Sequence, residues 1–129
     1  MLKKSLLLGI VSGLLAGIVA VIWARVYFKI NEADFSKVAS NVRIIASSLF
    51  GGVLAAIGYS LLDKWLKEKG EIVFNFIFTI LSFATLAAPI LMRLPHNIDT
   101  PELFPGMAIP MHLFPAMAWY TLKPIFIRQ

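Results

Sequence analysis

Four long apolar blocks, separated by three short polar joins, restrict this chain to very few folds. The blocks cover about residues 6–28, 44–62, 72–94 and 103–122. Each approaches the roughly 20 residues that a helix needs to cross the hydrocarbon core of a bilayer. The joins are too short to form a separate soluble domain. The pattern therefore predicts an all-α membrane protein, with residues 1–129 forming one domain of four transmembrane helices in a compact bundle.

Composition agrees with this prediction. Hydrophobic residues make up 59% of the 129 residues, charged residues 15%, and the mean hydropathy is +0.81. A soluble domain of this size could not hide so much apolar side chain, because much of a small fold stays at the surface. The first apolar run, 6–23, is also longer than the roughly 7 to 15 residues of a signal-peptide core. We therefore expect a retained span, and the lipid bilayer as its surroundings.

The charges indicate topology rather than nucleic-acid binding. The net charge is +5, but the twelve Lys and Arg residues are scattered through the joins and at block ends, where they suit lipid headgroups and membrane orientation. The chain has no cysteine, which excludes thiol chemistry and cysteine-ligated metals. Neither a nucleic-acid partner nor a cofactor is expected.

Four spans would place both termini on one side of the membrane. The basic residues on that side are Lys3, Lys4, Lys64, Lys67, Lys69, Lys123 and Arg128; those on the other side are Arg25, Lys29, Lys37, Arg43 and Arg93. This excess predicts a multi-pass protein of the plasma (inner) membrane with cytoplasmic termini. For the first join, residues 32–43, we expect a short interfacial helix.

Small residues recur every four positions in the first two blocks. The first block carries Gly9, Gly13 and Gly17, with a second ridge of Ser12, Ala16, Ala20 and Ala24. The second block carries Ser47, Gly51 and Ala55, and beside them Ser48, Gly52, Ala56 and Ser60. Such ridges let helix backbones approach closely. One interpretation is that the two helices pack on each other within one chain. The other is that at least one ridge contacts a second copy or a larger membrane subunit.

The third block has a polar stripe. Asn75, Thr79, Ser82, Pro89 and Arg93 return to nearly the same helical face. Polar groups in a membrane normally face the protein interior. The stripe therefore predicts either hydrogen bonds to neighbouring helices or a narrow polar cleft with Arg93 at its mouth, suited to an anion or a lipid headgroup.

Prolines interrupt the last two blocks. Pro110 and Pro115 each remove an amide donor and clash with the carbonyl four residues earlier, as Pro89 does in the third block. We expect bends or local unwinding at these three positions. The freed carbonyls need donors in a membrane, and we expect the polar stripe or His112 to supply them.

The functional interpretation of the fourth block depends on the role of His112. It can form a structural hydrogen bond to another helix, or it can serve a ligand or a proton. No Asp or Glu lies inside any predicted span to act as its proton partner. His112 also points about 100° away from Met111 on a helix, so the two do not converge on a metal.

The sequence contains no nucleophile–base pair, no phosphate-binding loop and no catalytic carboxylate pair. An enzymatic role is therefore not favoured. The leading hypothesis is a small non-catalytic integral membrane protein that acts as an oligomeric unit or accessory subunit of a larger assembly. The alternative is a small transporter or channel whose polar path contains Asn75, Thr79, Ser82, Arg93 and His112.

Overall fold

The computed structural model describes residues 1–128, and these residues form helices joined by short loops, without a β-strand among them. The elements in chain order are α1 (Leu2–Asn31), α2 (Asn41–Leu66), the 3-10 helix η1 (Lys67–Lys69), α3 (Gly70–Ala84), α4 (Ala87–Leu91), the 3-10 helix η2 (Pro101–Leu103) and α5 (Phe104–Phe126). The chain is thus all-helical, as predicted.

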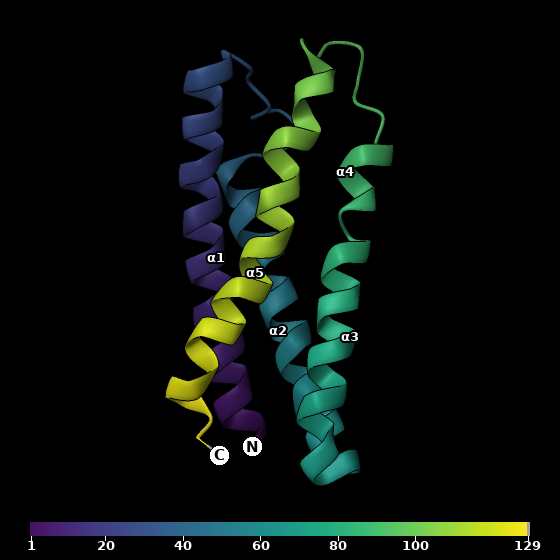
Figure 1. Cartoon of the computed structure of the whole chain (residues 1–129). Helices are drawn as coiled ribbons and strands as arrows, with labels where there is room; N and C mark the ends of the chain where they lie inside the picture. The colour runs from purple at the N-terminus through teal and green to yellow at the C-terminus, as the bar shows by residue number, and fades with distance from the viewer. Residues whose placement is uncertain (129) are drawn as a thin grey trace.

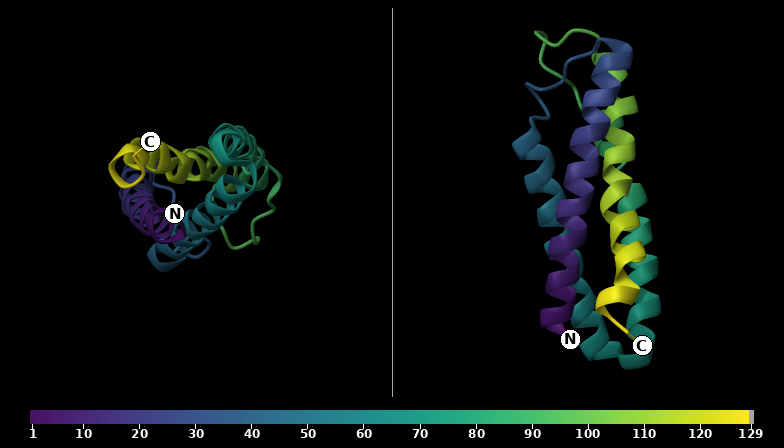
Figure 2. Two further views of the ribbon diagram at one scale, coloured as in Figure 1. Left: turned by 90° about the horizontal axis from the view of Figure 1, so that it is seen from below. Right: turned by 90° about the vertical axis from the view of Figure 1, so that its left-hand side faces the viewer.

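The long helices lie side by side in a bundle, with both termini at one end (Figure 1). Helix α1 packs on α2 and α5, and α3 packs on the same two helices from the other side (Figure 2). Among the described residues, two helical stretches are long and apolar enough to cross a membrane, Leu2–Asn31 and Asn41–Leu91. The second stretch reverses direction at η1 (Figure 1), and α5 is not among them. Length and hydropathy therefore identify two spanning stretches where the sequence pattern predicted four helices.

The surface of the bundle is strongly apolar. Large side chains such as Phe76 and Leu91 are 68% and 77% exposed, while the buried positions include serines and many small residues. Soluble monomers rarely expose contiguous apolar surface on this scale. The fold is therefore associated with a membrane.

Glycines bring the backbones of α1 and α2 into direct contact. A Cβ added to Gly52 would lie 2.1 Å from the carbonyl oxygen of Gly9, and one added to Gly13 would lie 2.9 Å from the Cα of Leu49. Gly17 meets Ile45 in the same way. At the end nearest the termini, the hydroxyl groups of Ser5 and Ser60 form a hydrogen bond. The first interpretation of these ridges, packing within one chain, describes this interface.

The join between α1 and α2 differs from its prediction. Residues 32–40 form a loop with a turn, not an interfacial helix. The Asp34 carboxylate accepts a hydrogen bond from the backbone N–H of Ser36, 2.9 Å away, which favours a turn and lowers the pKa of Asp34 below its ordinary value. Ala33 and Phe35 are buried beside Phe104 and Ile98, so the loop covers one end of the bundle.

Pro89 divides the third predicted span into two helices. Because Pro89 has no N–H, the Thr85 carbonyl instead accepts a hydrogen bond from the N–H of Ala88, 3.1 Å away. The N–H of Leu86 likewise donates to the carbonyl of Phe83, and both are the three-residue hydrogen bonds of a 3-10 turn. The Thr85 hydroxyl donates to the Ser82 carbonyl at 2.7 Å. As a result α3 ends at Ala84, and the chain leaves the helical path at Met92 rather than at residue 94.

Helix α5 continues through Pro110 and Pro115 without unwinding, and its path bends toward α1 (Figure 1). Two aromatic side chains of α1 donate to carbonyls near the start of α5: Trp23 Nε1 to that of Met107 at 3.0 Å, and Tyr27 OH to that of Leu103 at 2.6 Å. Neither is a carbonyl that Pro110 or Pro115 frees, since those belong to Gly106 and Met111. The expected donation by the polar stripe or His112 to the freed carbonyls stays a prediction.

Candidate functional site

A groove of about 810 Å³ opens between α2, α3 and α5. It lies within the 300–1,000 Å³ range of pockets that hold small molecules. Most of its lining is apolar or small, and the lining side chains on α2 extend from Arg43 to Leu62. The groove is therefore the candidate site described below.

The second small-residue ridge of α2 faces this groove. Ser47, Gly51 and Ala55 line it at four-residue spacing. Gly51 has no atom within 4 Å of where a Cβ would lie, whereas the adjacent Gly52 is pressed against Gly9. One ridge of α2 therefore packs on α1. On the other ridge Ala55 is buried in the core, while Ser47 and Gly51 line the open part of the groove.

Two of the five residues of the predicted polar path line the groove. Ser82 from α3 and His112 from α5 both line it, with Thr85 beyond the end of α3. Within the described residues the half-buried His112 ring makes no hydrogen bond. The imidazole is therefore free to bind a molecule in the groove.

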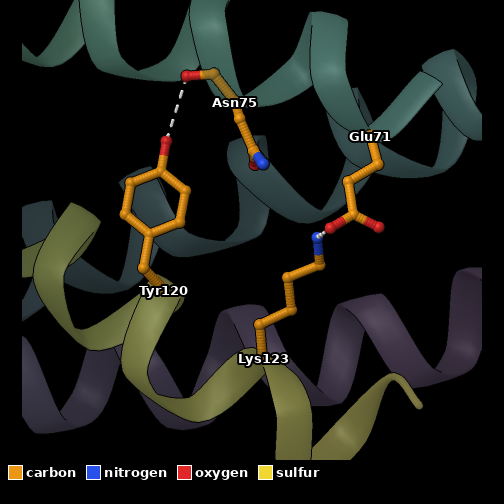
Figure 3. Close-up of polar contacts among 4 residues, drawn as sticks. All are labelled: Glu71, Asn75, Tyr120 and Lys123. Atoms are coloured by element: carbon orange, nitrogen blue, oxygen red, sulfur yellow. Dashed lines mark hydrogen bonds and ion pairs between the residues drawn. The ribbon is translucent and has the colours of Figure 1, made fainter. Parts of the chain in front are cut away.

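The rest of the polar stripe holds α3 against α5. Tyr120 OH donates to the backbone carbonyl of Asn75 at 3.1 Å (Figure 3) and lies 3.0 Å from Thr79 Oγ1. Because a phenol has one hydrogen to donate, the Thr79 hydroxyl donates to Tyr120. Neither Asn75 nor Thr79 lines the groove. The Thr79 side chain thus makes an ordinary interhelical hydrogen bond of the kind that joins membrane helices. Asn75 contributes its backbone carbonyl, while its side-chain Oδ1 is buried without a hydrogen-bond partner among the described residues.

The polar contact between α3 and α5 continues to a buried ion pair that the sequence reasoning missed. The Lys123 ammonium pairs with the Glu71 carboxylate (Figure 3). Lys123 is 8% exposed, and its Nζ lies 4.9 Å from the centre of the Tyr59 ring. Trp119, one turn before Lys123, is fully buried against the same ring. Residues Glu71, Asn75 and Thr79, spaced by four, thus form one ladder along α3.

The positions of two arginines relative to the groove differ from the prediction. Arg93 is exposed in the segment after α4 and does not line the groove, so it forms no mouth for a polar cleft there. Arg43, which the sequence reasoning counted as a topological charge, lies in the groove lining. Arg43 precedes Ser47 and Gly51 at the same four-residue spacing, and this spacing indicates that it shares their face of the helix.

The site thus combines an apolar groove, an unhindered glycine, a histidine without a hydrogen-bond partner in the described residues, and an arginine at one end. Comparisons with protein-family models, with curated proteins and with solved structures found no match to this chain.

Proposed function

We propose that this protein is a small, non-catalytic integral membrane protein that holds a hydrophobic molecule of the bilayer in the groove between α2, α3 and α5. The observation that carries the proposal is the groove itself, about 810 Å³ with a mostly apolar lining, to which α1 contributes Ala20 alone among the described residues because α1 packs on the other face of α2. An apolar groove inside a membrane is filled by something apolar, because water there would lose its hydrogen bonds.

The proposal includes four membrane-spanning segments with cytoplasmic termini. Helices α2 and α3 form an antiparallel pair around η1, and α5 has 23 residues, enough for roughly 34 Å of helix. Both termini lie at one end of the bundle, as an even number of crossings requires (Figure 1). Burial of Lys123 in its ion pair reduces the exposed positive charge at that end. The charge difference that supports the orientation is correspondingly smaller.

Membership in a larger membrane assembly is the second candidate. It is favoured by the Ser47–Gly51 ridge, because a Cβ at Gly51 would meet no atom of the described residues within 4 Å and such ridges accept partner helices. The transporter alternative has weaker support. Ser82 and His112 line the groove but Asn75, Thr79 and Arg93 do not, so the five polar residues do not line one path.

Intact mass measurement after purification in mild detergent tests the proposal. We expect the chain to retain a lipid-sized molecule, and Gly51→Leu to remove it by filling the groove. Ala84→Leu is the matched control, because Ala84 is exposed and does not line the groove. Retention of another protein subunit that Gly51→Leu expels would favour the second candidate instead. A bare chain for both wild type and variants would refute both.

A further inference from the structure

The groove has a polar end and an apolar end. Ser47 and Ser48 lie near the start of α2, Ser82 and Thr85 near the end of α3, and His112 in the first half of α5. Helix α3 runs antiparallel to both α2 and α5 (Figure 1), so these positions gather at one end. Toward η1 the lining residues are apolar, namely Leu54, Leu62, Phe74, Ile77 and Phe78. The groove is therefore amphipathic along its length.

A positive charge stands at the polar end. The Arg43 guanidinium is held there by donating from one terminal nitrogen to the carbonyls of Lys37 and Val38, at 3.4 and 3.2 Å. Its remaining N–H groups are available, since a guanidinium carries five donors. Helix α2 also begins here at Asn41, and the N-terminal end of a helix favours anions. No acidic side chain of the described residues lines the groove.

The groove is long enough for an acyl chain. Its lining on α2 spans nineteen residue steps, from Arg43 to Leu62, which is roughly 28 Å of helix. This length is close to the roughly 30 Å hydrocarbon core of a bilayer. An acyl chain that lies along the bilayer normal crosses one leaflet, and it therefore fits within the length of the groove.

We infer that the groove binds a phospholipid, with its phosphate at Arg43 and an acyl chain along the apolar part of α2 and α3. This inference rests on the proposed function and names the ligand class. The phosphate accepts charge-assisted hydrogen bonds from the guanidinium, and Ser47 and His112 offer further hydrogen-bonding groups below it. Because Gly51 has no side chain, the groove has room there for the acyl chain.

Native mass spectrometry of the purified full chain, with added dioleoylphosphatidylglycerol or dioleoylglycerol, tests the inference. The two probes share their chains and differ in the phosphate and its headgroup. Wild type should prefer the phospholipid. Arg43→Gln should weaken phospholipid binding roughly tenfold, the worth of a charge-assisted hydrogen bond, and leave diacylglycerol binding unchanged. Arg25→Gln is the matched control, because Arg25 does not line this groove.

Groove filling separates this inference from the proposed function. Gly51→Leu should weaken binding of both probes, while Ala84→Leu should weaken neither. If Gly51→Leu weakens both probes but Arg43→Gln changes nothing, the groove holds an apolar molecule and the phosphate assignment is wrong. If neither variant changes the binding of either probe, the inference and the proposed function both fail. Circular dichroism of each variant in detergent shows whether the helices are retained.

Discussion

Gly51 and Gly52 are adjacent on α2, and we predict opposite outcomes for the same substitution. A Cβ at Gly52 would lie 2.1 Å from the carbonyl oxygen of Gly9, a backbone atom that no side-chain rotation can move. A Cβ at Gly51 would meet no atom within 4 Å. Gly52→Ala and Gly51→Ala therefore form a matched pair that differs only in which face of α2 gains a methyl group.

The cost of Gly52→Ala follows from the distance. Ordinary van der Waals contact begins at 3.4 Å, so α1 and α2 must separate by about 1.3 Å at this point. A gap of about 0.5–1 Å already forfeits a quarter to a half of each dispersion contact. The close contacts at Gly13 and Gly17 lie on the same interface and would be weakened together. Overpacking costs about 1–3 kcal/mol, and we expect about 3 kcal/mol here.

For Gly51→Ala we expect no loss of stability. The methyl group enters open space, and replacement of glycine within a helix favours the helical state by about 0.5–1 kcal/mol. Reversible unfolding in mixed detergent micelles, followed by circular dichroism, measures both free energies. Gly52→Ala should lower the folding equilibrium constant roughly hundredfold, while Gly51→Ala should match or exceed wild type.

Equal losses for the two variants would refute this reasoning, because they would mean that α1 does not distinguish the two faces of α2. A larger loss for Gly51→Ala would point to a helix seated on the Gly51 face. An accessory check is the Gly9→Ala variant, which should resemble Gly52→Ala, since the two glycines face each other.

Three further predictions concern the polar contacts. Tyr120→Phe removes the hydroxyl that joins α5 to Asn75 and Thr79, and should cost about 1 kcal/mol in the same unfolding assay; no change would mean that these hydrogen bonds are absent in the membrane. Glu71→Gln leaves the Lys123 ammonium buried without its anion and should cost about 2 kcal/mol, whereas the double variant Glu71→Leu with Lys123→Met should be nearly neutral; equal losses would contradict the ion pair. Folding lowers the pKa of Asp34. Its carboxylate therefore stabilises the fold at pH values above its ordinary pKa of 3.8, and this stabilisation is lost as the pH falls through the lowered pKa of the folded state. Wild type should therefore lose stability below about pH 4 more than Asp34→Ala does, and parallel pH profiles would contradict the turn.

The sequence predicts which residues share one face of a helix better than it predicts which helix that face contacts. Four-residue spacing places Gly9, Gly13 and Gly17 on one side of a helix whatever that helix meets. That this side meets Gly52 depends on the loop between α1 and α2, whose turn at Asp34 no hydrophobic pattern specifies. Periodicity therefore predicted the ridges and left open which helix each one contacts.

The polar stripe illustrates the same limit. Its spacing predicted that Asn75 and Thr79 face the protein interior and bond to neighbouring helices. Thr79 bonds to Tyr120 but is exposed, and Asn75 is bonded to Tyr120 through its backbone carbonyl alone. The continuation of the ladder to Glu71 and Lys123 was missed, because charges at the ends of apolar blocks are ordinarily assigned to topology. A lysine four residues after Trp119 gave no signal of burial, since long basic side chains at helix ends usually extend to the interface.

The groove follows from how these contacts divide the available surfaces. The ladder at Glu71, Asn75 and Thr79 fixes the first part of α3 against α5, while Pro89 ends the regular helix just beyond Ala84. Helix α1 is held by glycine contacts on the opposite face of α2. Neither neighbour can therefore cover Gly51 without giving up its own contacts. Because closing the groove would break either the ladder or the α1–α2 interface, the open space is a consequence of the bundle's strongest contacts, and a lipid can fill it at no cost to either.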